Sequence, residues 1–111
     1  MYFELPKSQK KIARQVIEKG LQKEFVNGLK KVDGLIEKWK SDKLDNREAY
    51  HKVYAAINEH DKHIGRRYDY MSGSKYLLIL AAQLADNVIT INDLKDFNDD
   101  VREKIISISN L

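Results

Sequence analysis

The apolar and polar side chains of residues 45–71 alternate with the period of an α-helix. The apolar ones recur at steps of three, four and seven residues: Tyr50, Val53, Tyr54, Ile57, Ile64, Tyr68 and Met71. Such steps place side chains on one face of a helix. Asp45 can accept a backbone N–H as the N-cap, and Glu48 stands at the capping-box position. We predict a helix over residues 45–71 that ends at Ser72-Gly73-Ser74, because glycine readily adopts the left-handed conformation that ends helices.

A second helical pattern covers residues 7–40. Its apolar stripe consists of Ile12, Val16, Leu21, Phe25, Leu29, Val32, Ile36 and Trp39. Gly20, Gly28 and Gly34 interrupt it, each at a cost of about 1 kcal/mol relative to alanine. A break near Gly20 is the alternative, but the stripe continues across it, so we predict one helix in which glycines on a packed face permit close approach. The short connection at residues 41–44 then predicts an antiparallel hairpin.

The hairpin is expected to pack through large apolar side chains of both helices. The expected contacts are Leu29, Val32, Ile36, Val53, Ile57 and Ile64.

The C-terminal third has shorter elements. Residues 75–85 are apolar on nearly all sides, which favours a buried helix over the alternative of a strand. Asp86-Asn87 breaks this helix, and Thr90 with Asp93 has capping-box spacing for a single turn. A last helix begins at Asn98 or Asp99. We expect Val101, Ile105 and Ile108 to face inward in that helix, and Tyr2, Phe3 and Leu5 to pack against the bundle or a partner.

Composition agrees with a single helical domain. The 111 residues include one proline and five glycines, too few turn signals for an all-β fold, and 42% are hydrophobic, enough for a core. We predict one all-α domain over residues 1–111, a small helical bundle with a long antiparallel helical hairpin covered by shorter C-terminal helices. Because short helices cannot cover a long hairpin completely, we also predict a homodimer, with a monomer as the alternative.

Several function classes lose support from composition alone. The chain has no cysteine, which excludes disulfides, thiolate nucleophiles and cysteine-based metal sites. No apolar run approaches the roughly 20 residues of a membrane span, and the N-terminus lacks the pattern of a signal peptide. No catalytic motif stands out. We therefore expect a cytoplasmic protein that is not an enzyme, needs no cofactor and has no membrane partner.

The best binding candidate is the corner that follows residues 45–71. Its predicted site residues are Arg66, Arg67, Tyr70, Ser72, Ser74 and Lys75. Guanidinium groups together with free N–H groups at a helix start suit a carboxylate or a phosphate. The alternative is an ordinary helix stop with solvated arginines.

Two other groups of residues suggest weaker alternatives. His60 and His63 stand at i and i+3 and could hold a transition metal, although no second motif completes such a site. The first predicted helix is rich in basic residues, at Lys7, Lys10, Lys11, Arg14, Lys19, Lys23, Lys30, Lys31, Lys38 and Lys40. A lysine face can bind nucleic acid, but interleaved acidic residues favour ordinary surface pairing.

The leading functional hypothesis is a small interaction or regulatory module that binds a protein partner, or itself, through helical surfaces. The alternatives are a nucleic-acid-associated protein that uses the lysine face and a metal-binding protein that uses His60 and His63.

Overall fold

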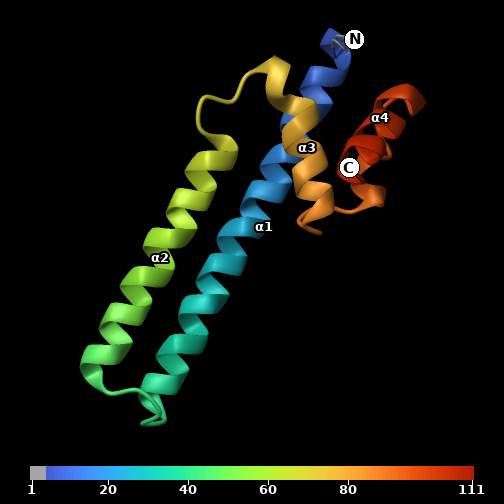
Figure 1. Cartoon of the computed structure of the whole chain (residues 1–111). Helices are drawn as coiled ribbons and strands as arrows, with labels where there is room; N and C mark the ends of the chain where they lie inside the picture. The colour runs from blue at the N-terminus through green and yellow to red at the C-terminus, as the bar shows by residue number, and fades with distance from the viewer. Residues whose placement is uncertain (1–4) are drawn as a thin grey trace. The chain divides into compact units, whose positions relative to one another are not determined.

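The computed structural model describes residues 5–111 and contains, within that range, four α-helices and no strand (Figure 1). The helices are α1 (Lys7–Lys40), α2 (Asn46–Tyr68), α3 (Tyr76–Ala85) and α4 (Asp99–Ser109), with short 3-10 turns η1 (Gly73–Lys75) and η2 (Ile91–Leu94). The predicted all-α class, with a long hairpin and shorter C-terminal helices, is confirmed. Leu5 is buried as expected, whereas Tyr2 and Phe3 lie outside the described residues.

The chain divides into two compact units that share helix α1. Unit 1 combines the part of α1 up to Lys23 with Tyr70–Leu111, and unit 2 is the hairpin segment Glu24–Asp69. That the whole chain acts as one domain stays a prediction.

Helix α1 continues through all three of its glycines, as predicted. It begins after Pro6, whose carbonyl accepts the N–H groups of Gln9 and Lys10 at 2.9 and 3.0 Å. Proline suits this place because its missing N–H is not needed in a first turn. Close packing requires a glycine at position 20, because a Cβ there would collide with the side chain of Gln83. The predicted close approach at a glycine is therefore confirmed at Gly20.

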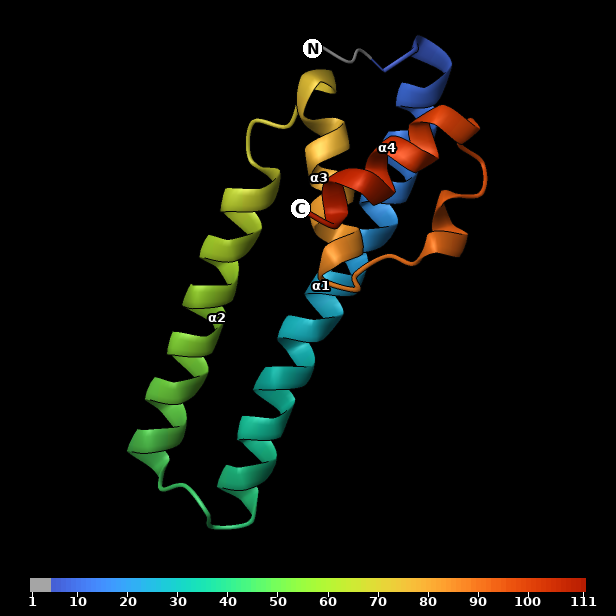
Figure 2. The same cartoon turned by 45° about the vertical axis from the view of Figure 1, so that its right-hand side comes forward.

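Unit 1 has a conventional apolar core. Figure 2 shows α3 and α4 side by side near the N-terminal part of α1. The largest fully buried side chains of the described residues all belong to this unit: Ile17, Leu80, Gln83, Ile89, Leu94, Val101 and Ile105. Val101 and Ile105 thus face inward as predicted, and Ile108 is half-buried.

Polar side chains join the elements of unit 1 at defined points. The side-chain amide of Gln83 donates to the carbonyl of Ile17 at 3.0 Å. The N–H of Asn98, at the N-cap of α4, donates to Oε1 of Gln9 at 2.8 Å. Such bonds satisfy polar groups that would otherwise be costly to bury.

The predicted capping box at η2 is confirmed. Thr90 and Asp93 exchange the two expected side-chain to backbone bonds. Nζ of Lys19 also lies 2.5 Å from Oδ1 of Asp93. This contact and the hydrogen bond from the Thr90 N–H lower the pKa of the Asp93 carboxyl.

Helix α2 begins as predicted but ends earlier. Oδ1 of Asp45 accepts the N–H of Glu48 at 2.8 Å. The helix stops at Tyr68 rather than Met71, and Tyr70 (φ 59°), not a glycine, adopts the left-handed conformation. The prediction that glycine ends this helix was therefore wrong. The C-cap is Asp69, which has an extended conformation (φ −63°, ψ 142°) and whose N–H donates to the carbonyl of Gly65 at 2.9 Å.

Candidate functional site

The two helices of unit 2 approach each other through small side chains. Ala49 and Ala56 of α2 are buried. A Cβ on Gly28 of α1 would lie 2.7 Å from Cε1 of His60. Glycine at this place lets the His60 ring lie against the α1 backbone, which is a second confirmed close approach. By contrast, no atom lies within 4 Å of a Cβ built on Gly34, so that glycine serves no such contact.

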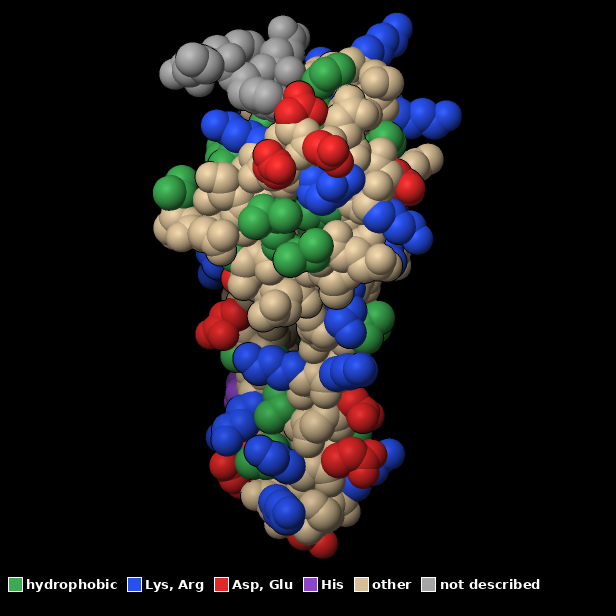
Figure 3. Space-filling model, turned by 90° about the vertical axis from the view of Figure 1, so that its right-hand side faces the viewer, with side chains coloured by type: hydrophobic (Ala, Val, Ile, Leu, Met, Phe, Trp, Pro, Cys, Tyr) green, Lys and Arg blue, Asp and Glu red, His purple; other side chains and the backbone are tan. Residues whose placement is uncertain are grey.

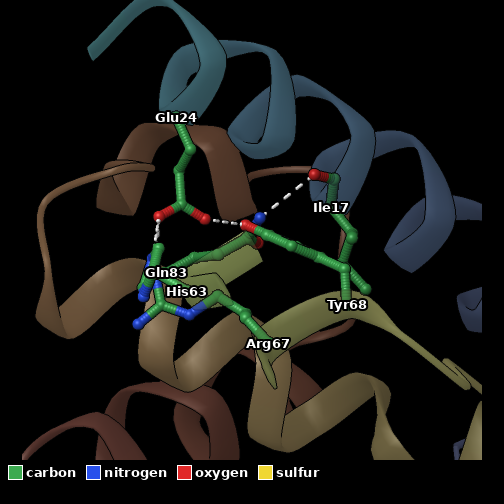
Figure 4. A network of polar contacts seen from close by, with 6 residues as sticks. All are labelled: Ile17, Glu24, His63, Arg67, Tyr68 and Gln83. Carbon is green, nitrogen blue, oxygen red and sulfur yellow. Dashed lines mark hydrogen bonds and ion pairs between the residues drawn. The ribbon is translucent and has the colours of Figure 1, made fainter. Parts of the chain in front are cut away.

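A buried carboxylate ties the helices together at one end of the hairpin. Only 5% of Glu24 is exposed. Its Oε1 lies 2.6 Å from Nε2 of His63 and accepts Nη1–H of Arg67 at 3.1 Å, while its Oε2 accepts the hydroxyl of Tyr68 (Figure 4). A buried charge requires partners of this kind, because removal from water is costly.

The same contacts control the ionisation of Glu24. Burial alone raises the pKa of its carboxyl. The hydrogen bonds from Tyr68 and His63, together with the positive charge of Arg67, outweigh that effect, so the pKa lies below its usual value. Glu24 is therefore held as a carboxylate at neutral pH.

Because small and polar groups occupy the line between the helices, large apolar side chains lie beside it. Leu29 is 64% exposed and Ile57 is 45% exposed. Val32, Ile36, Val53 and Ile64 are only half-buried. The prediction that these six side chains form the inner contact of the hairpin was therefore wrong for Leu29 and Ile57.

Ile57, together with the half-buried Ile36 and Val53, lines a groove between α1 and α2. It encloses about 590 Å³, and its lining residues are Ile36, Trp39, Asn46, Ala49, Tyr50, Val53, Tyr54 and Ile57. Nε1–H of Trp39 donates to Oδ1 of Asn46 at 2.8 Å, which fixes the indole against α2. Tyr50 is 74% exposed and Tyr54 is 66% exposed. The lining contains no carboxylate, histidine or lysine, so it suits the binding of apolar surface rather than acid–base chemistry.

The groove belongs to a longer apolar surface, which we call the hairpin seam. Its members are Phe25, Leu29, Val32, Ile36 and Trp39 of α1 with Tyr50, Tyr54, Ile57 and Ile64 of α2. The sequence predicted that the hairpin has an incomplete cover, but it assigned five members of the seam to the inner contact, namely Leu29, Val32, Ile36, Ile57 and Ile64. The three aromatic residues Trp39, Tyr50 and Tyr54 were the sequence signal that could have indicated this surface, because exposed aromatic clusters are typical of interfaces.

The predicted corner site is divided between the two units. In unit 2, Arg66 is exposed and Arg67 is bound to Glu24. In unit 1, Tyr70 is 91% exposed, Oγ of Ser72 lies 3.0 Å from Oγ of Ser74, and Lys75 is exposed at the end of η1. Carboxylate or phosphate binding by these six residues stays a prediction.

The histidines and lysines have ordinary surroundings. The ring centroids of His60 and His63 are 6.2 Å apart, and within residues 5–111 no group of three or more histidine or acidic side chains could hold a metal ion. Basic and acidic side chains are interspersed on the face drawn in Figure 3. Lys40 lies 3.6 Å from Glu37, as in common surface pairing.

None of the helices described in residues 5–111 is long and apolar enough to cross a membrane. No protein-family model matches the sequence, and comparisons with curated proteins and with solved structures give no match either.

Proposed function

We propose that this protein is a non-enzymatic interaction module whose hairpin seam binds helices of another polypeptide chain. The observation that carries this proposal is the groove of about 590 Å³, with exposed Tyr50 and Tyr54 on one wall and Trp39 on the other. Monomeric proteins rarely leave a contiguous apolar surface of this kind in water, whereas aromatic residues are enriched in protein interfaces.

The geometry of the groove favours helices as the bound elements. The groove runs between two antiparallel helices, and such surfaces typically accept the apolar stripe of an amphipathic helix. The lining is mostly apolar and aromatic and contains no carboxylate, histidine or lysine, which favours a binding role. The hydrogen bond from the indole of Trp39 to Asn46 joins this wall of the groove to α2.

Site-specific photocrosslinking in the source cells tests the proposal. A photoreactive phenylalanine derivative replaces Tyr54 in one variant and Ala55 in a control. Ala55 is also exposed, but lies about 100° around α2 from Tyr54. We expect discrete covalent adducts from the Tyr54 position, attached to a helical segment of another chain, and only background from the Ala55 position.

A second substitution in the crosslinking variant makes the result specific for the seam. Ile57→Lys should abolish the adducts, because it places a charge among the lining residues of the groove. Absence of adducts from the Tyr54 position, or equal adducts from both positions, would contradict the proposed function.

A further inference from the structure

The hairpin seam has a spacing that identifies the kind of surface it fits. On α1 the members Phe25, Leu29, Val32, Ile36 and Trp39 are separated by steps of four, three, four and three residues. This is the 3.5-residue repeat of helices that pack along their whole length against other helices. On α2 the repeat contains Tyr50, Tyr54, Ile57 and Ile64, with Asp61 as its polar position. Single polar positions set the register in such assemblies.

The two repeats lie side by side on one face of unit 2, since residues of both helices line the same groove. A single partner helix would fill the groove but would leave the outer edges of both repeats in water. Two antiparallel helices would match both repeats, and together they would complete a four-helix bundle. An antiparallel pair of helices with this repeat is what a second copy of the chain would supply.

The exposed area of the seam is a large part of what a stable dimer buries. The four aromatic members of the seam leave on the order of 450 Å² exposed, if a whole aromatic side chain offers about 200 Å². Leu29, which is 64% exposed, and Ile57, which is 45% exposed, add to this, so the seam supplies more than half of the about 800 Å² that each partner buries in a standard interface. This area is at the upper end of the about 300–600 Å² of the largest apolar patch on a typical monomer, which is itself often functional.

The thin core of unit 2 points in the same direction. Its buried apolar residues are Leu44, Ala49, Ala56 and Tyr68. Leu44 and Tyr68 lie beyond the ends of the seam, and the two alanines contribute only a methyl group each. Helices in proteins derive most of their stability from tertiary packing of an apolar face. A second hairpin would provide that packing along both repeats.

We propose that a second copy of this chain covers the hairpin seam, and that the two hairpins form a two-fold symmetric four-helix bundle. This inference rests on the proposed function and specifies its partner. In a two-fold symmetric contact both copies use the same surface, so each substitution in the seam changes the dimer interface at two places.

Sedimentation of the purified chain from about 1 µM to about 100 µM tests the inference through mass action. We expect a species of twice the chain's mass at the higher concentrations. Tyr54→Lys should raise the dissociation constant about 100-fold, roughly tenfold for each copy. The control Ala55→Lys adds the same charge to a neighbouring exposed residue outside the groove and should change that constant less than about twofold. Because Tyr54 is largely exposed in a single chain, Tyr54→Lys should keep the helical circular dichroism of the wild type.

Trp39 reports which face is covered, because it is the chain's only tryptophan and it lines the groove. Quenching of its fluorescence by acrylamide should increase on dilution of the wild type and should be insensitive to dilution in Tyr54→Lys. A dimer whose Trp39 quenching does not change on dilution, or equal effects of both lysine substitutions, would overturn the inference.

A chain that stays monomeric over the whole concentration range would also overturn it. The proposed function is decided separately: adducts from Tyr54 to a different polypeptide would then support that function, whereas their absence would remove it as well.

Discussion

Units 1 and 2 are both helical, but they use different means to hold their helices together. In unit 1, Ile17, Leu80 and Ile105 are fully buried in an apolar core. In unit 2 the helices meet through Gly28, small alanines and the carboxylate network of Glu24, while larger apolar side chains remain exposed. The comparison teaches that two regions with similar helical patterns can differ in whether their apolar side chains face inward. Unit 1 buries several large apolar side chains completely, whereas the large apolar side chains of unit 2 are mostly exposed or half-buried.

The largest expected difference concerns leucine truncation in the two units. Leu80→Ala should lower the free energy of unfolding by about 3 kcal/mol, because it leaves a cavity in a fully buried place. Leu29→Ala should change it by less than about 0.5 kcal/mol, because that side chain is mostly in water. Urea unfolding in the Tyr54→Lys background, where the seam cannot be covered by a second copy, measures both values. Similar losses for the two variants would contradict the contrast between the units.

The next effect concerns the polar network of unit 2. Glu24→Gln keeps the size of the side chain but removes the charge that balances Arg67, and should cost about 2 kcal/mol of unfolding free energy. Glu59→Gln is a matched control at an exposed place in α2 and should have little effect. Chemical denaturation at neutral pH measures the difference. Equal stability of the two variants would show that the network does not hold the hairpin together.

Because the pKa of Glu24 is lowered, the free energy of unfolding should depend on pH in a defined direction. The folded state holds fewer protons at this carboxyl than the unfolded state, so its stabilisation is present above the ordinary value of 4.5 and is lost as the pH falls through the lowered pKa. The stability difference between wild type and Glu24→Gln should therefore shrink as the pH falls from about 5 to about 3. A difference that grew on acidification would contradict this assignment.

The smallest expected changes in stability come from alanine substitutions at two glycines of α1. Gly20→Ala should destabilise by about 1–2 kcal/mol, because the new methyl group would collide with the buried Gln83. Gly34→Ala should stabilise by about 0.5–1 kcal/mol, because its surroundings are open and alanine is the better helix former. Thermal unfolding of both variants measures these changes. Destabilisation by Gly34→Ala would indicate that its surroundings are not open as described.

Local signals were sufficient for the element boundaries wherever the cause was itself local. Asp45 with Glu48 and Thr90 with Asp93 cap their helices as the spacing predicted. The end of α2 differs from its prediction, because Asp69 already leaves the helical conformation and Tyr70, not a glycine, is left-handed. The glycine signal at Ser72-Gly73-Ser74 therefore placed this end too late in the sequence.

The apolar periods of α1 and α2 determined that two long helices form. They did not determine which flank of each stripe faces the neighbouring helix. That choice follows from the close approach at Gly28 and the buried partners of Glu24, which turn the line of contact toward small and polar groups. Helical periodicity places a side chain around its own axis, whereas the rotation of one helix against another depends on how distant side chains fit together. For this reason Ile57 was predicted to lie in the inner contact of the hairpin, but it lines the open groove in the folded chain.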